Sequence, residues 1–383
     1  MSQEPLVSIG VPTYNDAPWL RNALDHLLSQ EHRNLEIILA DDGSSDGSRE
    51  ICREYTQKDS RIRFFENNHN LGAVENHKFV FNLSQGDYFA WGSGHDYYHP
   101  KFVSKTLEVL QTNDTAVMCC SKTVFIDEMA QVMRTTRGDL DMSTLLPVDR
   151  FKKVLSFTVQ GGTANIVNGL YRHDALSRVN LSRRVAGSDV ILLGELSLLG
   201  EIVQLDEILF YRLINKAESG KERIHRHAKI AKREGGDGME ISTPYFDASS
   251  EFLHMAENCN LSVSEKHIIC EAIIEQDVNL GKANLEEEIT LFLSHATNKL
   301  SRLQSYPHIK DYRAAIIQSI INRAWSLDLE ARDVPIWRSS ASLALNLGSG
   351  LTGIRHEHIR PEQSDLDPTT LNYPERSKPA DPI

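Results

Sequence analysis

The sequence predicts an α/β protein with a mostly parallel sheet covered by helices on both faces, followed by a helical C-terminal region. Short, continuously apolar runs recur along the first half of the chain, which is typical of strands buried on both faces. Between them, apolar residues recur at helical spacing, as in residues 19–28. Because strand and helix alternate, the strands need crossover connections and lie parallel in one sheet.

The elements are expected in a regular order. The expected strands are residues 6–11, 35–40, 61–65, 87–91, 116–120, 166–171 and 208–212. The expected helices of this part are residues 19–28, a helix capped by Ser45 or Asp46 that runs through Ile51 and Tyr55, and residues 73–83. Beyond residue 246 the periodicity is helical, and Ser262 with Glu265 fits a capping box.

These patterns divide the chain into four parts. We expect an α/β domain over residues 1–220, a basic and Gly-rich linker or lid over 221–245, a helical accessory region over 246–354 and a disordered tail over 355–383. The linker carries six Lys or Arg residues between Lys221 and Arg233. A solvated face, a lid over phosphates and a patch for acidic lipid all fit that charge.

Composition excludes some classes of function. The net charge of −12 over 383 residues argues against a nucleic-acid partner, since such proteins need basic surface. The five cysteines form no CxxC pair, so a reducing compartment is expected. The N-terminus lacks a signal-peptide pattern, and no stretch reaches the ~20 apolar residues of a membrane span. The expected location is the cytoplasm, including peripheral attachment to the inner face of a membrane.

The segment Asp41–Asp46 (DDGSSD) follows the second expected strand directly. Its carboxylates therefore lie at the carboxyl edge of the sheet, where open α/β folds bind their ligands. Asp46 is expected mainly to cap the next helix. Asp42 is expected to contact a ligand, because an ionised carboxylate only accepts hydrogen bonds and pairs well with an N–H group.

Three ordered blocks resemble one family. They are residues 7–15 (VSIGVPTYN), residues 35–46 (LEIILADDGSSD) and residues 70–100, which contain N-x-G, then GDYFAW, then a polar turn before Pro100. Together they resemble the donor half of family 2 glycosyltransferases over about residues 5–215. The resemblance implies the GT-A fold and a nucleotide-sugar donor.

The resemblance also implies roles for particular residues. Asp42 would accept a hydrogen bond from the ring N–H of a uracil-type base, with Thr13 and Asn15 lining the same pocket. An arginine near the end of the last expected strand would approach phosphate. The donor-binding residues implied in this way are Pro12, Thr13, Tyr14, Asn15, Asp42, Asn70, Gly72, Asn76, Ser93, Asp96 and Arg212.

The third block departs from the family where a divalent cation is normally held. The usual Asp-x-Asp-Asp stretch is replaced by Ser93-Gly94-His95-Asp96. His95 and Asp96 are the candidate ligands for Mn²⁺ or Mg²⁺, and imidazole suits manganese-like ions better than magnesium. Two alternatives stay open: His95 as a solvated loop residue, and weak or absent metal dependence.

Asp189 resembles the general base of the family, although the glutamate that usually precedes it is Ser188. The base would take the proton of an acceptor hydroxyl as the oxygen attacks the anomeric carbon, so the configuration inverts. The alternative is that Asp189 only interacts with the positive end of a helix dipole. The apolar run 190–193 that follows it is consistent with a helix beginning there.

The sequence therefore predicts an inverting, hexosyltransferase-type enzyme that moves a sugar from a nucleoside diphosphate, with UDP favoured. Its acceptor would be a hydroxyl of a glycan or of a lipid-linked molecule, as in surface polysaccharide synthesis. A degenerate family member that binds a nucleotide sugar or a partner without catalysis is the first alternative. A sugar nucleotidyltransferase is disfavoured, because Pro12–Asn15 stands where its Gly-rich, Arg-containing loop is expected.

Overall fold

The computed structural model describes residues 4–136, 140–160, 167–183, 187–214, 251–252, 254–256 and 258–281. All of these belong to one compact unit within residues 1–328. The predicted linker 221–245, the tail 355–383 and most of the predicted helical region 246–354 lie outside the described residues, as do residues 161–166.

The described part contains a nine-stranded sheet with the order β3-β2-β1-β4-β8-β6-β9-β5, in which β7 pairs with β6. The strands are β1 Val7–Thr13, β2 Leu35–Asp41, β3 Ile62–Glu66, β4 Tyr88–Trp91, β5 Tyr97–Tyr98, β6 Ala116–Ile126, β7 Val132–Thr135, β8 Leu170–Arg172 and β9 Glu201–Leu213. The described helices are α1 Ala17–Leu28, α2 Ser48–Lys58, α3 Ala73–Asn82, α4 Phe102–Thr112, α5 Pro147–Gln160, α6 His173–Ser177, α7 Ser188–Leu199 and α10 Val263–Gly281.

The first half of the sheet has the predicted parallel order. β1 pairs with β2 and with β4, and β2 pairs with β3, all in parallel. In the second half, β8 runs antiparallel to both β4 and β6, while β6 and β9 are parallel. The α/β fold is confirmed, with a mixed second half that the strand–helix alternation of the first half did not reveal.

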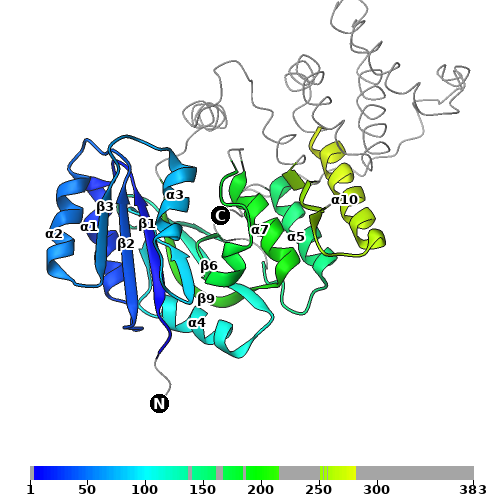
Figure 1. Ribbon diagram of the computed structural model, residues 1–383, viewed down its shortest axis with the longest axis horizontal. Coiled ribbons are helices and arrows are strands. Elements are labelled where there is room, and N and C mark those ends of the chain that lie inside the picture. Colours follow the sequence, from blue (N-terminus) through cyan, green and yellow to red (C-terminus); the bar gives the residue numbers. More distant parts are fainter. Residues whose placement is uncertain are drawn as a thin grey trace, which may run out of the picture. The chain divides into compact units, whose positions relative to one another are not determined.

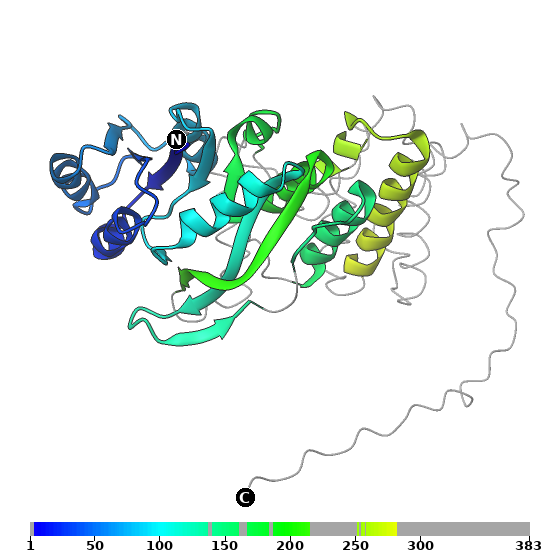
Figure 2. The ribbon, with the colours of Figure 1, turned by 90° about the horizontal axis from the view of Figure 1, so that it is seen from below.

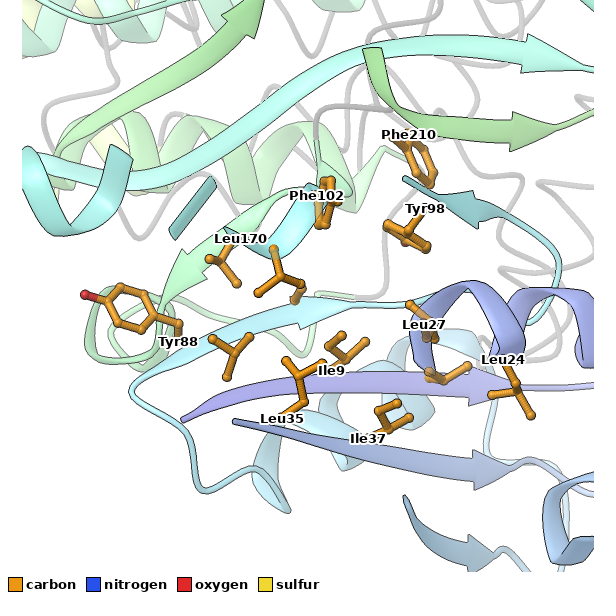
Figure 3. Packing of buried hydrophobic residues seen from close by; sticks show 14 of the residues in the cluster. Ile9, Leu24, Leu27, Leu35, Ile37, Tyr88, Tyr98, Phe102, Leu170 and Phe210 are labelled. Carbon is orange, nitrogen blue, oxygen red and sulfur yellow. The ribbon is translucent and has the colours of Figure 1, made fainter. Parts of the chain in front are cut away.

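Helices cover both faces of this sheet (Figure 1). On one face, apolar residues of α1, α2 and α4 pack on the strands; Leu24 and Leu27 lie against Ile9 and Ile37 (Figure 3). On the other face, α3 and α7 cover Ile38, Phe89 and their neighbours. Burial on both faces explains why the first strands are continuously apolar rather than alternating.

Gly10 sets how closely α3 approaches β1. A Cβ atom at Gly10 would lie 2.7 Å from Cγ2 of Val80 and 2.9 Å from Cζ of Phe89. Replacing Gly10 by alanine is expected to lower the free energy of unfolding by about 1–3 kcal/mol, because the core is overpacked. Denaturant titration checks this. In a Val80→Ala background the same change is expected to cost less, and an equal cost in both backgrounds would contradict the contact.

Helices α5 and α10 run side by side (Figure 2) and share an apolar cluster with α7 and with Phe252, Met255 and Ala256. Phe151 and Phe252 meet edge to face with ring centroids 5.5 Å apart. The predicted capping box at the start of α10 is confirmed: Ser262 N donates to Oε2 of Glu265 at 2.9 Å, and Glu265 N donates to Oγ of Ser262 at 3.3 Å. Among the described helices, none has the length and apolar character that crossing a bilayer requires.

The predicted cap of α2 is confirmed for the carboxylate of Asp46, which accepts the first amide of the helix, but not for the N-cap position. The helix begins at Ser48 with Gly47 as its N-cap, in the left-handed conformation at φ 96°. Asp46 binds the starts of both α1 and α2. Its Oδ2 accepts the amide of Ala17, and its Oδ1 accepts the amide and the hydroxyl of Ser48. Burial opposes ionisation of Asp46, but these hydrogen bonds hold its pKa below the ordinary value.

Candidate active site

A cavity of about 370 Å³ opens at the carboxyl ends of β1 and β4. Helix α3, the start of α7, the end of β9 and residues 167–168, 180–181 and 183 also contribute to its walls. Six of the predicted site residues line it: Pro12, Ser93, His95, Asp96, Asp189 and Arg212. They come from four separate parts of the sequence, so the fold gathers the predicted metal ligands, the predicted base and the predicted phosphate-contacting arginine in one place.

Asp42 does not line this cavity, although it lies at the same edge of the sheet. Its side chain is buried and holds the loop that leads into α3: Oδ1 accepts from Nδ2 of Asn67 at 3.1 Å and from the amide of Leu71 at 2.8 Å. Oδ2 accepts from the amide of Gly72 at 3.0 Å. An ionised carboxylate offers about four acceptor positions, so these three hydrogen bonds leave one position of Oδ2 unused. Base recognition by Asp42 stays a prediction.

The other residues of the N-x-G block also stay outside the cavity lining. Oδ1 of Asn70 accepts the amide of Gly72, which has φ 91° and forms the N-cap of α3. Asn76 is buried, and its Nδ2 donates to the carbonyl of Ala40 at 2.9 Å. In this structure the block holds α3 against the end of β2, next to the cavity wall.

The predicted residues after Pro12 are also outside the cavity lining. Thr13 is buried, whereas Tyr14 is 41% exposed. Asn15 has φ 55°, and its Oδ1 accepts the amide of Ser45 at 2.9 Å. Asn15 thus holds the DDGSSD loop against the end of β1, and its predicted contact with a nucleotide remains untested.

The carboxylate of Asp41 serves the start of α2. Oδ1 accepts Nε of Arg49 at 2.6 Å and the amides of Gly43 and Ser44. The side chain is fully buried, and its Oδ2 has no hydrogen-bond partner in the described structure. Alternation along β2 explains the difference from Asp42: Asp41 points toward the face covered by α1 and α2, and Asp42 toward the face covered by α3.

His95 and Asp96 stand side by side at the cavity with different surroundings. Nδ1 of His95 lies 3.0 Å from Oδ1 of Asp16. Burial favours the neutral ring, but this hydrogen bond and the charges of Asp96 and Asp16 raise the pKa of His95 above its ordinary value. Asp96 is 4% exposed and accepts the amide of Leu213 at 2.9 Å; burial raises its pKa.

Two groups at the cavity are candidate donors for a divalent cation. With Nδ1 bound to Asp16, the other ring nitrogen of His95 is the one able to coordinate, and Asp96 supplies a carboxylate. In the part of the chain that the structure describes, no group of three or more His, Cys, Asp and Glu side chains is suited to a metal ion. Two protein donors fit an ion that also takes oxygens from a bound diphosphate, as Mg²⁺ does in many phosphate sites.

Asp189 lies in the first turn of α7, whose N-cap Gly187 has φ 80°. Oδ1 accepts the amide of Val190 at 2.9 Å, so the carboxylate also favours the helix N-terminus. Asp189 also lines the cavity. Its two predicted roles, helix terminus and cavity carboxylate, are therefore compatible.

Sequence reasoning missed several polar residues of the cavity wall. They are His77, Lys78, Asn180 and Arg183. Nζ of Lys78 donates to Oγ of Ser182 at 2.6 Å, which joins α3 to the segment before α7. Arg183 is buried and pairs with Glu195 at 2.6 Å and Glu251 at 2.9 Å. No motif marks these residues, because each contact joins segments distant in the sequence.

Comparison with known proteins assigns this domain to a family. Residues 8–179 match the sequence profile described as Glycosyl transferase family 2. This part of the chain belongs to that family. Glycosyltransferase GlyG of Streptococcus pneumoniae serotype 4 is 31% identical over 113 residues, which are 30% of this chain and 38% of that protein. An uncharacterised glycosyltransferase of Haemophilus influenzae is 32% identical over 150 residues, 39% of this chain and 60% of that protein.

The family assignment agrees with the fold. The crystal structure of S. aureus TarS 1–349 in complex with UDP-GlcNAc superposes with a TM-score of 0.54 and 15% identity, covering 89% of this chain and 88% of that chain. At that identity the likeness shows a shared GT-A fold alone. The matched stretches span 28–60% of the lengths of the first relatives in sequence, so the family 2 domain is the part they share.

Proposed function

We propose that this protein is an inverting glycosyltransferase that moves a sugar from a UDP-sugar to a hydroxyl of a glycan or of a lipid-linked acceptor. The observation that carries the proposal is the cavity, which brings Asp189, the His95–Asp96 pair and Arg212 together within a family 2 domain. Two related proteins support it: TarS has been crystallised with UDP-GlcNAc, and GlyG is named a glycosyltransferase.

The donor would occupy the edge of the sheet between two groups of residues. Asp42 would accept the base N–H with its remaining acceptor position, while Arg212 would donate to the diphosphate. His95 and Asp96 would hold a divalent cation together with diphosphate oxygens. When bound, such a cation offsets the negative charge that develops on the leaving diphosphate.

Asp189 would act on the acceptor. Its carboxylate would take the proton of the acceptor hydroxyl while that oxygen forms a bond to the anomeric carbon. The bond between that carbon and the diphosphate oxygen breaks, and UDP leaves with the bonding electrons. Attack from the side opposite the diphosphate inverts the configuration.

A panel of nucleotide sugars, each with and without Mn²⁺, tests the proposal. We expect UDP and UDP-sugars to raise the melting temperature, with affinities in the micromolar-to-millimolar range, and slow release of UDP from the preferred sugar with water as acceptor. Binding without any turnover would favour the non-catalytic alternative, in which Ser93 replaces a carboxylate of the usual motif. No stabilisation by any nucleotide sugar would contradict the donor site.

A further inference from the structure

A carboxylate from the loop after β1 holds the imidazole of His95. Oδ1 of Asp16 lies 3.0 Å from Nδ1 of His95, across 79 positions of the sequence. The Asp16 side chain is 12% exposed and the His95 side chain 43% exposed, so the pair has a buried end and a cavity end. Among the described residues, Nε2 of His95 has no hydrogen-bond partner.

Asp16 occupies the N-cap position of α1, where an aspartate side chain normally accepts a backbone amide of the helix. Its side chain, however, makes no capping hydrogen bond to that helix. Oδ2 accepts the amide of Tyr14 at 3.2 Å, and the first amide of the helix, that of Ala17, is taken by Asp46. Asp46 therefore accepts the first amide of α1, and Oδ1 of Asp16 binds His95.

Gly94 makes the approach of Asp16 sterically allowed. A Cβ atom at Gly94 would lie 2.5 Å from Oδ2 and 2.8 Å from Cγ of Asp16. Any side chain at residue 94 would therefore displace the carboxylate. Trp19 borders the ring of His95 edge-on, with ring centroids 6.5 Å apart. One hydrogen bond and the edge contact with Trp19 thus limit the orientation of the ring.

We propose that Asp16 is a positioning residue that keeps the hydrogen of the neutral His95 ring on Nδ1 and directs the lone pair of Nε2 toward a divalent cation bound with the donor diphosphate. The physical reason is that an ionised carboxylate only accepts hydrogen bonds, so the nitrogen facing it carries the hydrogen. Metal-binding histidines are commonly oriented in this way by a carboxylate on their other nitrogen. The inference rests on the proposed function for the cation and the diphosphate.

The first test needs neither metal nor nucleotide. In the full chain labelled with ¹⁵N-histidine, long-range ¹H–¹⁵N spectra at a pH where the ring is neutral report which nitrogen carries the hydrogen; His95→Gln assigns the signal. We expect the Nδ1–H form in the wild type and in Asp16→Asn, whose amide oxygen still accepts. In Asp16→Ala we expect the Nε2–H form to dominate. The same tautomer in the wild type and in Asp16→Ala would overturn the proposal.

The second test measures Mn²⁺ affinity in the presence of UDP. We expect Asp16→Ala and Gly94→Ala to weaken it by about ten- to a hundredfold, the usual effect of losing a carboxylate behind a metal-binding histidine. UDP affinity without metal should stay within about twofold, which excludes a general loss of structure. If the wild type binds UDP and both variants keep its Mn²⁺ affinity, the inference fails and the proposed function stands. If the wild type binds no nucleotide, both fail.

Discussion

Replacing Asp189 by asparagine is expected to slow sugar transfer by about a hundred- to ten-thousandfold, the range that a positioned general base contributes. The amide has nearly the shape of the carboxylate, but it cannot take the proton of the acceptor hydroxyl. UDP affinity should stay unchanged, because the proposed donor contacts come from other elements. Steady-state rates together with calorimetric titration of UDP measure the two effects separately.

Helix α5 provides a matched control for this substitution. Asp149 is also a carboxylate in the first turn of a helix, but it is exposed and lies outside the cavity lining. Asp149→Asn removes a comparable interaction with a helix N-terminus, worth about 0.3–1 kcal/mol. Its transfer rate should equal that of the wild type. If Asp189→Asn keeps its turnover, Asp189 is not the general base.

Replacing Asp42 is expected to weaken UDP binding by about ten- to a hundredfold. One hydrogen bond to a charged group contributes about 1.5–3 kcal/mol, and each 1.4 kcal/mol is a factor of ten in affinity. Asp42→Ala should also lower the free energy of unfolding, because the partly buried amide of Leu71 loses its acceptor and the amide of Gly72 keeps only Oδ1 of Asn70. Calorimetry with UDP and denaturant titration of the same samples measure both.

Two further variants distinguish the effect of Asp42 on UDP binding from its effect on the loop that leads into α3. Asp42→Asn keeps an acceptor for the loop but loses the charge, so its UDP affinity should fall while its stability falls less than in Asp42→Ala. Asn67→Ala removes the hydrogen bond from Nδ2 to Oδ1 of Asp42 and leaves the carboxylate in place. Its UDP affinity should change by less than in either Asp42 variant. Equal affinity in the wild type, Asp42→Ala and Asp42→Asn would count against Asp42 as the base-recognition residue.

The fold was predictable from the sequence to the extent that its contacts are local. The first four strands and the helices between them follow from apolar runs and turn residues, and all are present near the expected positions. The antiparallel insertion of β8 between β4 and β6 was not predictable. A strand was expected at residues 166–171, but its direction and its neighbours are selected by pairing over long distances in the sequence.

Helix ends show the same limit. The capping box of Ser262 and Glu265 was predicted correctly, because both partners lie within one turn. The cap predicted for Asp46 was right only in part: its carboxylate accepts the amide of Ser48 at the start of α2, but it also accepts the amide of Ala17 at the start of α1, 29 residues earlier. Capping rules use only the residues next to one helix, so they cannot predict that a side chain also binds the start of a second helix.

The sequence alone determined which polar residues end the strands, and parallel pairing then placed the DDGSSD segment and the His95–Asp96 pair at one edge of the sheet. Only the tertiary structure decided which of these side chains face the cavity and which hold loops. It also decided that Asp16 faces His95 and that Lys78 and Arg183 join the cavity wall. The reason is physical: strand ends follow from local hydrophobic pattern, whereas each of these contacts joins segments brought together by packing of the whole core.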